Sequence, residues 1–146
     1  ALEVLRQTGK PLSACAVPVA PRSCYDFLLI ALERPREELY RRIDERVDAM
    51  FAAGLTGEVR ELLRGGASEA DPGMQAIGYR EFLQARRAGC MRMRDVRDAI
   101  ALDSRRYAKR QLTIFRSLPG VEWFSAEDRR GIRRRILRWW EADEGR

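Results

Sequence analysis

The sequence contains no histidine, and this absence excludes several kinds of active site. Without imidazole there is no Ser–His or Cys–His nucleophilic pair, no histidine general base and no histidine-containing metal site. Cysteine is scarce: Cys15, Cys24 and Cys90 lie far apart and show no CxxC spacing. These cysteines indicate neither a zinc ribbon nor a disulfide scaffold, and we interpret them as thiols of a reducing compartment.

Long apolar runs are also missing. No stretch approaches the roughly 20 residues that a membrane span requires, and the N-terminus shows no basic stretch followed by an apolar one, as a signal peptide would. The chain is therefore expected to be soluble and cytoplasmic, with no membrane partner. A glycine-rich phosphate loop of the Walker type is absent as well.

The chain is long enough for one domain with its own core, with 146 residues of which 45% are hydrophobic. Lys and Arg number 28 against 22 Asp and Glu, which gives a net charge of +6. This balance favours a polyanionic partner without identifying it.

The strongest local pattern is a basic helix expected over residues 91–116. At helical periodicity, one face gathers Val96, Ile100, Ser104, Tyr107, Ala108, Leu112 and Phe115. The other face gathers Arg105, Arg106, Lys109, Arg110 and Arg116. Such a face suits phosphates, and the interleaved Tyr107, Gln111 and Thr113 can bind sugars, phosphates or base edges. The alternative is an ordinary solvated face.

Two strands and several further helices are expected. The length of the apolar run at residues 25–32 favours a strand buried on both faces of a parallel sheet, although its Leu and Ala residues also allow a helix. Residues 121–124 are the other candidate strand. Because two short strands do not form a stable sheet alone, the missing strands are expected in sequence outside this chain. The abrupt start likewise suggests a piece of a longer protein. The expected helices are residues 1–7, 36–53, 57–64, a segment from 73 into a helix ending near 87, and 126–140; residues 11–22 are expected to form a loop.

Two features of the helical segments allow a functional reading. Arg42 and Arg46 flank the apolar stripe of the helix expected over 36–53. Their stems can cover the core margin, or their guanidinium groups can point into a cleft and bind a diphosphate. Gly78 stands inside a helical pattern at a cost of about 1 kcal/mol, which predicts a close approach of another backbone.

Four motifs follow in order: RIDERVDAM at 42–50, GL…EV at 54–59, MQAIGYRE at 74–81 and RYAKRQ…FR at 106–116. Together they closely resemble the C-terminal half of bacterial tRNA dimethylallyltransferases, and the resemblance extends from residue 1 to about 124. Two positions depart from the family pattern. Ser104 stands where Thr is usual, and Ile114 replaces a usual Trp.

The resemblance implies an enzyme that transfers a dimethylallyl group from dimethylallyl diphosphate to N6 of the adenine 3′-adjacent to the tRNA anticodon, with that base flipped out of its stack. It implies an α/β fold of the P-loop kinase type with a parallel sheet, to which this chain supplies the mostly helical C-terminal part with one or two strands. Mg²⁺ and the P-loop would neutralise the leaving diphosphate. The P-loop and the general base belong to a missing N-terminal half, so the isolated chain is expected not to be competent.

Site residues follow from the matching motifs. The expected diphosphate-binding residues are Arg42 and Arg46. The residues expected to bind the tRNA anticodon stem-loop are Gln75, Ala76, Ile77, Gly78, Tyr79, Arg80, Asp103, Ser104, Arg105, Arg106, Tyr107, Ala108, Lys109, Arg110 and Gln111. No catalytic residue or metal ligand is assigned to this portion. Residues 1–124 are expected to belong to the transferase core and residues 125–146 to a basic C-terminal helix.

Three alternatives stay open. The first is a stand-alone RNA-binding module without catalytic activity. The second is a DNA-binding helical domain, which lacks support because no compact helix-turn-helix pair precedes the basic helix. The third is a relative that prenylates free adenine nucleotides, against which the tRNA-contact motifs argue.

Overall fold

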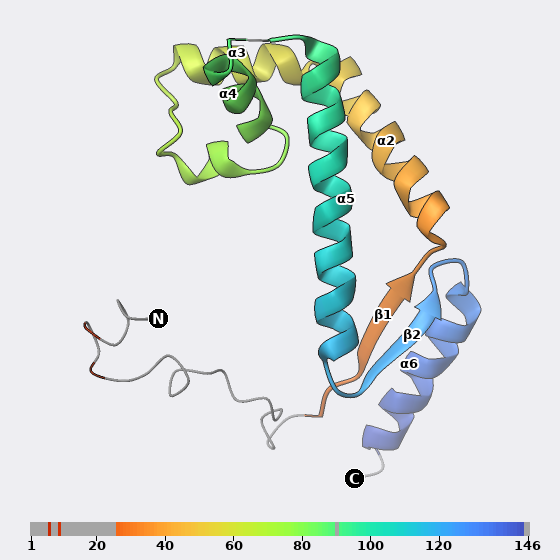
Figure 1. Cartoon of the computed structure of the whole chain (residues 1–146). Helices are drawn as coiled ribbons and strands as arrows, with labels where there is room; N and C mark the ends of the chain where they lie inside the picture. Colours follow the sequence, from red (N-terminus) through yellow and green to blue (C-terminus); the bar gives the residue numbers. More distant parts are fainter. Residues whose placement is uncertain (1–5, 7–8, 10–25, 90, 145–146) are drawn as a thin grey trace.

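The computed structural model describes residues 6, 9, 26–89 and 91–144. The predicted segments 1–7 and 11–22 therefore lie outside the described residues, apart from Arg6. The described elements (Figure 1) are β1 (Leu29–Glu33), α2 (Arg36–Ala52), α3 (Leu55–Arg64), the 3₁₀ helix η2 (Pro72–Gln75), α4 (Arg80–Arg87), α5 (Met93–Ser117), β2 (Val121–Ser125) and α6 (Arg129–Glu144). Within these ranges, no helix is long and apolar enough to cross a bilayer.

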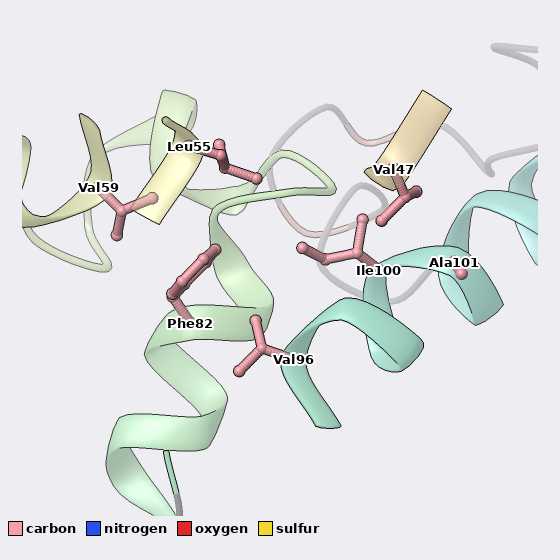
Figure 2. Packing of buried hydrophobic residues seen from close by; sticks show 7 residues of the cluster. All are labelled: Val47, Leu55, Val59, Phe82, Val96, Ile100 and Ala101. Carbon is pink, nitrogen blue, oxygen red and sulfur yellow. The ribbon is translucent and has the colours of Figure 1, made fainter. Parts of the chain in front are cut away.

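The core forms where four helices meet. Figure 2 shows its buried residues, which are Val47 from α2, Leu55 and Val59 from α3, Phe82 from α4, and Val96, Ile100 and Ala101 from α5. Burial of each larger aliphatic side chain contributes about 1.5 to 3 kcal/mol. The helices predicted over 36–53, 57–64 and 91–116 are confirmed, with starts at Leu55 and Met93 for the latter two. The predicted terminal helix is also present, shifted to Arg129–Glu144.

The segment around Gly78 differs from the prediction. Helix α4 begins only at Arg80, so Gly78 lies in the turn before the helix and not inside it. Its φ of +108° belongs to the left-handed region that glycine favours. A Cβ atom here would stand 3.3 Å from Cε of Met50. The close neighbour is thus a side chain of α2, and the prediction of an approaching backbone was wrong.

The two strands pair in parallel, with Leu29 beside Val121 and Glu33 beside Ser125. Both predicted strands are confirmed, although β1 starts at Leu29. The prediction that β1 is buried on both faces was wrong for the described residues. Only Ala31 of this strand is buried, and Leu32 is 55% exposed. The reason is that α5 does not close over β1, because a groove of about 570 Å³ lined by Leu29, Leu32 and Phe115 lies between them.

Helices α5 and α6 lie on opposite faces of this sheet. Successive side chains of a strand point to opposite faces. Glu122 accepts hydrogen bonds from Arg135 of α6 at 2.7 and 2.9 Å, whereas Arg116 of α5 lies 5.8 Å from the ring centroid of the next residue, Trp123. The sheet therefore separates the end of α5 from α6.

Candidate functional site

A groove of about 730 Å³ runs between α2, the turn from η2 to α4, and the middle of α5. We call it the central groove. Its lining residues are Leu39, Ile43, Arg46, Val47, Met50, Gln75, Ala76, Ile77, Arg80, Ile100, Ser104, Tyr107, Ala108, Arg110 and Gln111. Three segments that are well separated in the sequence thus meet at one concave surface.

The groove brings together many of the predicted site residues. Those that line it are Arg46, Gln75, Ala76, Ile77, Arg80, Ser104, Tyr107, Ala108, Arg110 and Gln111. The predicted residues outside its lining are Arg42, Gly78, Tyr79, Asp103, Arg105, Arg106 and Lys109. The apolar lining residues were not predicted as site residues, because their helical spacing on α2 and α5 is that of a core; they are Leu39, Ile43, Val47, Met50 and Ile100.

One wall of the groove combines an aromatic ring with a cation. Tyr107 is 49% exposed, and the guanidinium of Arg110 lies 5.9 Å from its ring centroid. Gln111 donates from Nε2 to the Tyr107 hydroxyl at 3.1 Å. Arg110 forms no ion pair within the described part of the chain. An exposed ring beside an unpaired guanidinium can stack a nucleobase and bind its phosphate.

The turn on the opposite wall is held by a buried carboxylate. Glu81 is only 2% exposed, and its Oε2 accepts the backbone N–H of Gly78 at 2.7 Å. Its Oε1 accepts from Nε of Arg80 at 2.9 Å. Gln75, before the turn, donates from Nε2 to the carbonyl oxygen of Glu69 at 2.6 Å. These bonds fix the backbone that carries the groove residues.

Arg80 lines the groove, but its charge is already balanced. It donates to Asp103 at 2.7 Å and to Glu81, and these two bonds raise the pKa of Arg80. Burial acts to raise the pKa of Asp103, but the hydrogen bonds from Arg80 and Arg106 outweigh it and leave the pKa below its usual range. Arg80 therefore fastens the turn to α5.

Arg105 differs from the prediction that it shares the basic face of α5. Its guanidinium forms an ion pair with Asp44 of α2 and lies 5.4 Å from the ring centroid of Tyr40. Arg36 approaches the same ring at 5.1 Å. Arg105 thus ties α5 to α2, and Arg106 is held by Asp103 at 3.1 Å.

The two predicted diphosphate-binding residues have different surroundings. Arg42 donates from Nε to Glu38 at 2.9 Å, and this bond is the main reason why the pKa of Glu38 lies below its usual range. Arg46, one turn further along α2, lines the central groove. It forms no ion pair with the described residues. Arg46 therefore presents the more available cation.

The described residues offer no ligand set for a metal ion. No group of three or more Cys, Asp or Glu side chains gathers in a way that could hold one. The carboxylates nearest the groove, Glu81 and Asp103, are taken up by Arg80. The described residues therefore do not fit the Mg²⁺ that the resemblance implies for the whole enzyme.

Comparison with known proteins gives consistent matches. The family model described as IPP transferase matches residues 1–118. The tRNA dimethylallyltransferase of Syntrophobacter fumaroxidans is 46% identical over 142 residues, covering 94% of this chain and 40% of the relative. That of Desulfatibacillum aliphaticivorans is 42% identical over 137 residues, covering 93% and 44%.

Solved structures agree in fold. The tRNA delta(2)-isopentenylpyrophosphate transferase of Staphylococcus epidermidis matches with a TM-score of 0.64 and 40% identity, covering 86% of this chain and 41% of its own. The tRNA isopentenylpyrophosphate transferase of Bacillus halodurans matches with a TM-score of 0.71 and 32% identity, covering 97% and 42%.

The chain spans about 40% of the length of these relatives. This agrees with the expectation that it corresponds to the C-terminal portion of such proteins. The mostly helical structure with a parallel pair of strands and the likeness to the solved structures confirm the predicted fold class. The chain belongs to the IPP transferase family.

Proposed function

We propose that this chain is the RNA-contacting part of a tRNA dimethylallyltransferase and that its central groove receives the tRNA anticodon stem-loop. The observation that carries the proposal is the convergence of α2, the turn before α4 and α5 on one groove that combines Arg46, Tyr107 and Arg110. The names of the relatives, all tRNA dimethylallyltransferases, support the same substrate.

The groove residues have distinct tasks in this proposal. The ring of Tyr107 stacks a base, and the guanidinium of Arg110 binds an adjacent phosphate. The side-chain amides of Gln75 and Gln111 supply donors and acceptors for base edges. These contacts hold a target adenine that has been flipped out of its stack, as is usual for enzymes that modify bases.

The proposed reaction of the whole protein is transfer of the dimethylallyl group to N6 of the adenine 3′-adjacent to the anticodon. Arg46 would meet the diphosphate of dimethylallyl diphosphate, because a guanidinium fork binds the charge that grows as the C–O bond breaks. Arg42 can bind the diphosphate only after its hydrogen bond with Glu38 is broken. The P-loop, the general base, Mg²⁺ and a cytoplasmic location are proposed for the whole protein and rest on the family.

The second candidate is an RNA-binding module without catalysis. It is favoured because no carboxylate lines the described groove. The nearest ones, Glu81 and Asp103, are engaged in ion pairs with Arg80. Both candidates require RNA binding. They differ in a transfer assay with labelled dimethylallyl diphosphate and an anticodon stem-loop, in which only the first candidate predicts a prenylated product from the full-length protein.

The shared requirement is tested by fluorescence anisotropy with an unmodified anticodon stem-loop. The variant Lys109→Gln/Arg110→Gln should bind at least about tenfold more weakly, with a salt slope lower by about 1 to 2, since each lost phosphate contact removes about 0.7 to 0.9. The control is Arg41→Gln/Arg64→Gln, because these exposed arginines pair with Glu45 and Glu61. Equal binding by both variants would contradict the proposal.

A further inference from the structure

Helix α6 carries a dense cationic surface on the side turned away from the sheet. Five exposed arginines form it, and we call them the arginine ladder: Arg129, Arg130, Arg133, Arg134 and Arg138. Arg130, Arg134 and Arg138 follow one another at i, i+4 spacing and so stand on one stripe of the helix. None of the five forms an ion pair with the side chains that the structure describes.

The ladder is not needed to dock the helix. The half-buried side chains of α6 include Ile132, Arg135 and Trp139, which share one face of the helix. Arg135 is turned inward and forms an ion pair with Glu122 at 2.5 Å. The arginines of the ladder point elsewhere, so packing of α6 does not explain their presence.

The ladder also opposes the stability of its own helix. Like charges at i, i+4 destabilise a helix by about 0.2 to 0.5 kcal/mol for each pair, and Arg129 and Arg130 stand at the positive end of the helix dipole. The first turn of α6 contains no acidic residue. The preceding Asp128 partly offsets this end, where its Oδ1 accepts the N–H of Gly131 at 2.9 Å. A bound polyanion would relieve the repulsion.

Apolar side chains are interleaved with the ladder. Leu137 is 47% exposed and Trp140 is 57% exposed, and at 100° per residue Leu137 falls between Arg130 and Arg133 on the helix surface. A helix that lies in a membrane interface needs its apolar side separated from its charges. On α6 the two are mixed, which favours nucleic acid, where cations bind phosphates and rings stack on bases.

We infer that the arginine ladder binds the phosphate backbone of RNA as a second surface, on the face of the sheet opposite to α5 and the central groove. This surface lies beyond residues 1–118, the part that the family model matches. The inference rests on the proposed function only for the choice of tRNA as the probe. The contact is electrostatic, so it adds affinity and salt dependence and reads no sequence.

The test compares two variants with the same change in charge. Arg130→Gln/Arg134→Gln/Arg138→Gln removes the central stripe of the ladder. Arg41→Gln/Arg64→Gln/Arg87→Gln removes three exposed arginines that pair with Glu45, Glu61 and Glu69. Binding of an unmodified full-length tRNA transcript is measured as a function of KCl concentration.

The ladder variant should lower the salt slope by about 2, at about 0.7 to 0.9 for each contact, and weaken binding at least about tenfold at 100 mM salt. Its melting temperature should equal or exceed that of the unaltered chain, because repulsion has been removed. The control should keep its salt slope. An unchanged slope in the ladder variant would overturn the inference, as would equal losses in both variants.

The two proposals can fail separately. If Lys109→Gln/Arg110→Gln weakens tRNA binding and the ladder variant does not, the ladder inference is wrong and the groove stands. If only the ladder variant weakens tRNA binding, the ladder inference is supported and the assignment of RNA to the central groove is wrong. Vesicles of phosphatidylserine and phosphatidylcholine serve as a second probe. Loss of vesicle binding in the ladder variant, with unchanged tRNA binding, would overturn the inference in favour of a membrane surface.

Discussion

Arg80, the first residue of α4, donates from Nη2 to Oδ2 of Asp103 on α5 at 2.7 Å. The same guanidinium holds the buried Glu81, which in turn accepts the N–H of Gly78. The turn on one wall of the central groove is thereby fastened to the helix that forms the other wall. The groove is organised by bonds within the protein before any ligand binds.

Asp103→Asn should therefore destabilise the fold by about 1.5 to 3 kcal/mol, the range for hydrogen bonds that involve charged groups. The pKa of Asp103 is lowered in the folded state, so its contribution is present above the ordinary aspartate pKa of about 4 and is lost as the pH falls through the lower, folded value. Urea unfolding at pH 7 and pH 3 measures this. The difference between the unaltered chain and the variant should shrink at the lower pH.

Asp98→Asn is the control for this measurement. Asp98 is exposed, and within the described part of the chain it forms an ion pair with its neighbour Arg97 at 3.1 Å. Its substitution should change the free energy of unfolding by less than about 0.5 kcal/mol. A pH-independent loss in Asp103→Asn, or equal losses in both variants, would show that the Arg80–Asp103 pair is not what holds the turn.

Gly78→Ala should destabilise the chain by about 1 to 2 kcal/mol, because a side chain disfavours positive φ. The new Cβ would also press on Met50 at 3.3 Å. Gly73→Ala is the control, since its Cβ would meet nothing within 4 Å. Thermal unfolding compares the two. If Gly73→Ala lowers the melting temperature as much as Gly78→Ala does, the positive φ of Gly78 is not the cause of the lost stability.

Arg105→Gln should lower the free energy of unfolding without changing the salt dependence of RNA binding. Loss of the Asp44 pair and of the contact with Tyr40 should cost about 1 to 3 kcal/mol. The salt slope of RNA binding should stay as it was, because Arg105 lies between α2 and α5. Anisotropy titrations of this variant and of Lys109→Gln/Arg110→Gln provide the comparison. A lower slope for Arg105→Gln would place this arginine on the RNA after all.

The helices could be predicted because the spacing of apolar residues within a single segment is enough to indicate a helix. Val96 and Ile100 repeat on one face of α5, and both are buried as that repeat predicts. The ion pair of Arg105 with Asp44 was not predicted because Asp44 lies 61 residues earlier, and the periodicity of α5 gives no information on contacts with α2. Gly78 was misplaced because the sequence does not state the sign of φ. The resemblance named the groove residues, but only the structure brings Arg46 and not Arg42 to the groove.

Arg46→Gln and Arg42→Gln should differ in the full-length protein. Arg46→Gln should raise the KM for dimethylallyl diphosphate at least about tenfold, or about 1.4 kcal/mol, because it removes an unpaired cation of the groove. Arg42→Gln should raise it less, because Glu38 holds Arg42. Steady-state kinetics at saturating tRNA measure both. A larger increase in KM for Arg42→Gln than for Arg46→Gln would show that Arg42, and not Arg46, is the main diphosphate-binding residue.

The most direct test of the central groove is photo-crosslinking of an unmodified anticodon stem-loop to the chain, followed by mass spectrometry. Crosslinks are expected in peptides that contain Tyr107 or the turn at residues 75–80. Helix α3, which does not line the groove, should carry none. Crosslinks confined to α3, or absent from both Tyr107 and the turn, would contradict the assignment of the groove to RNA.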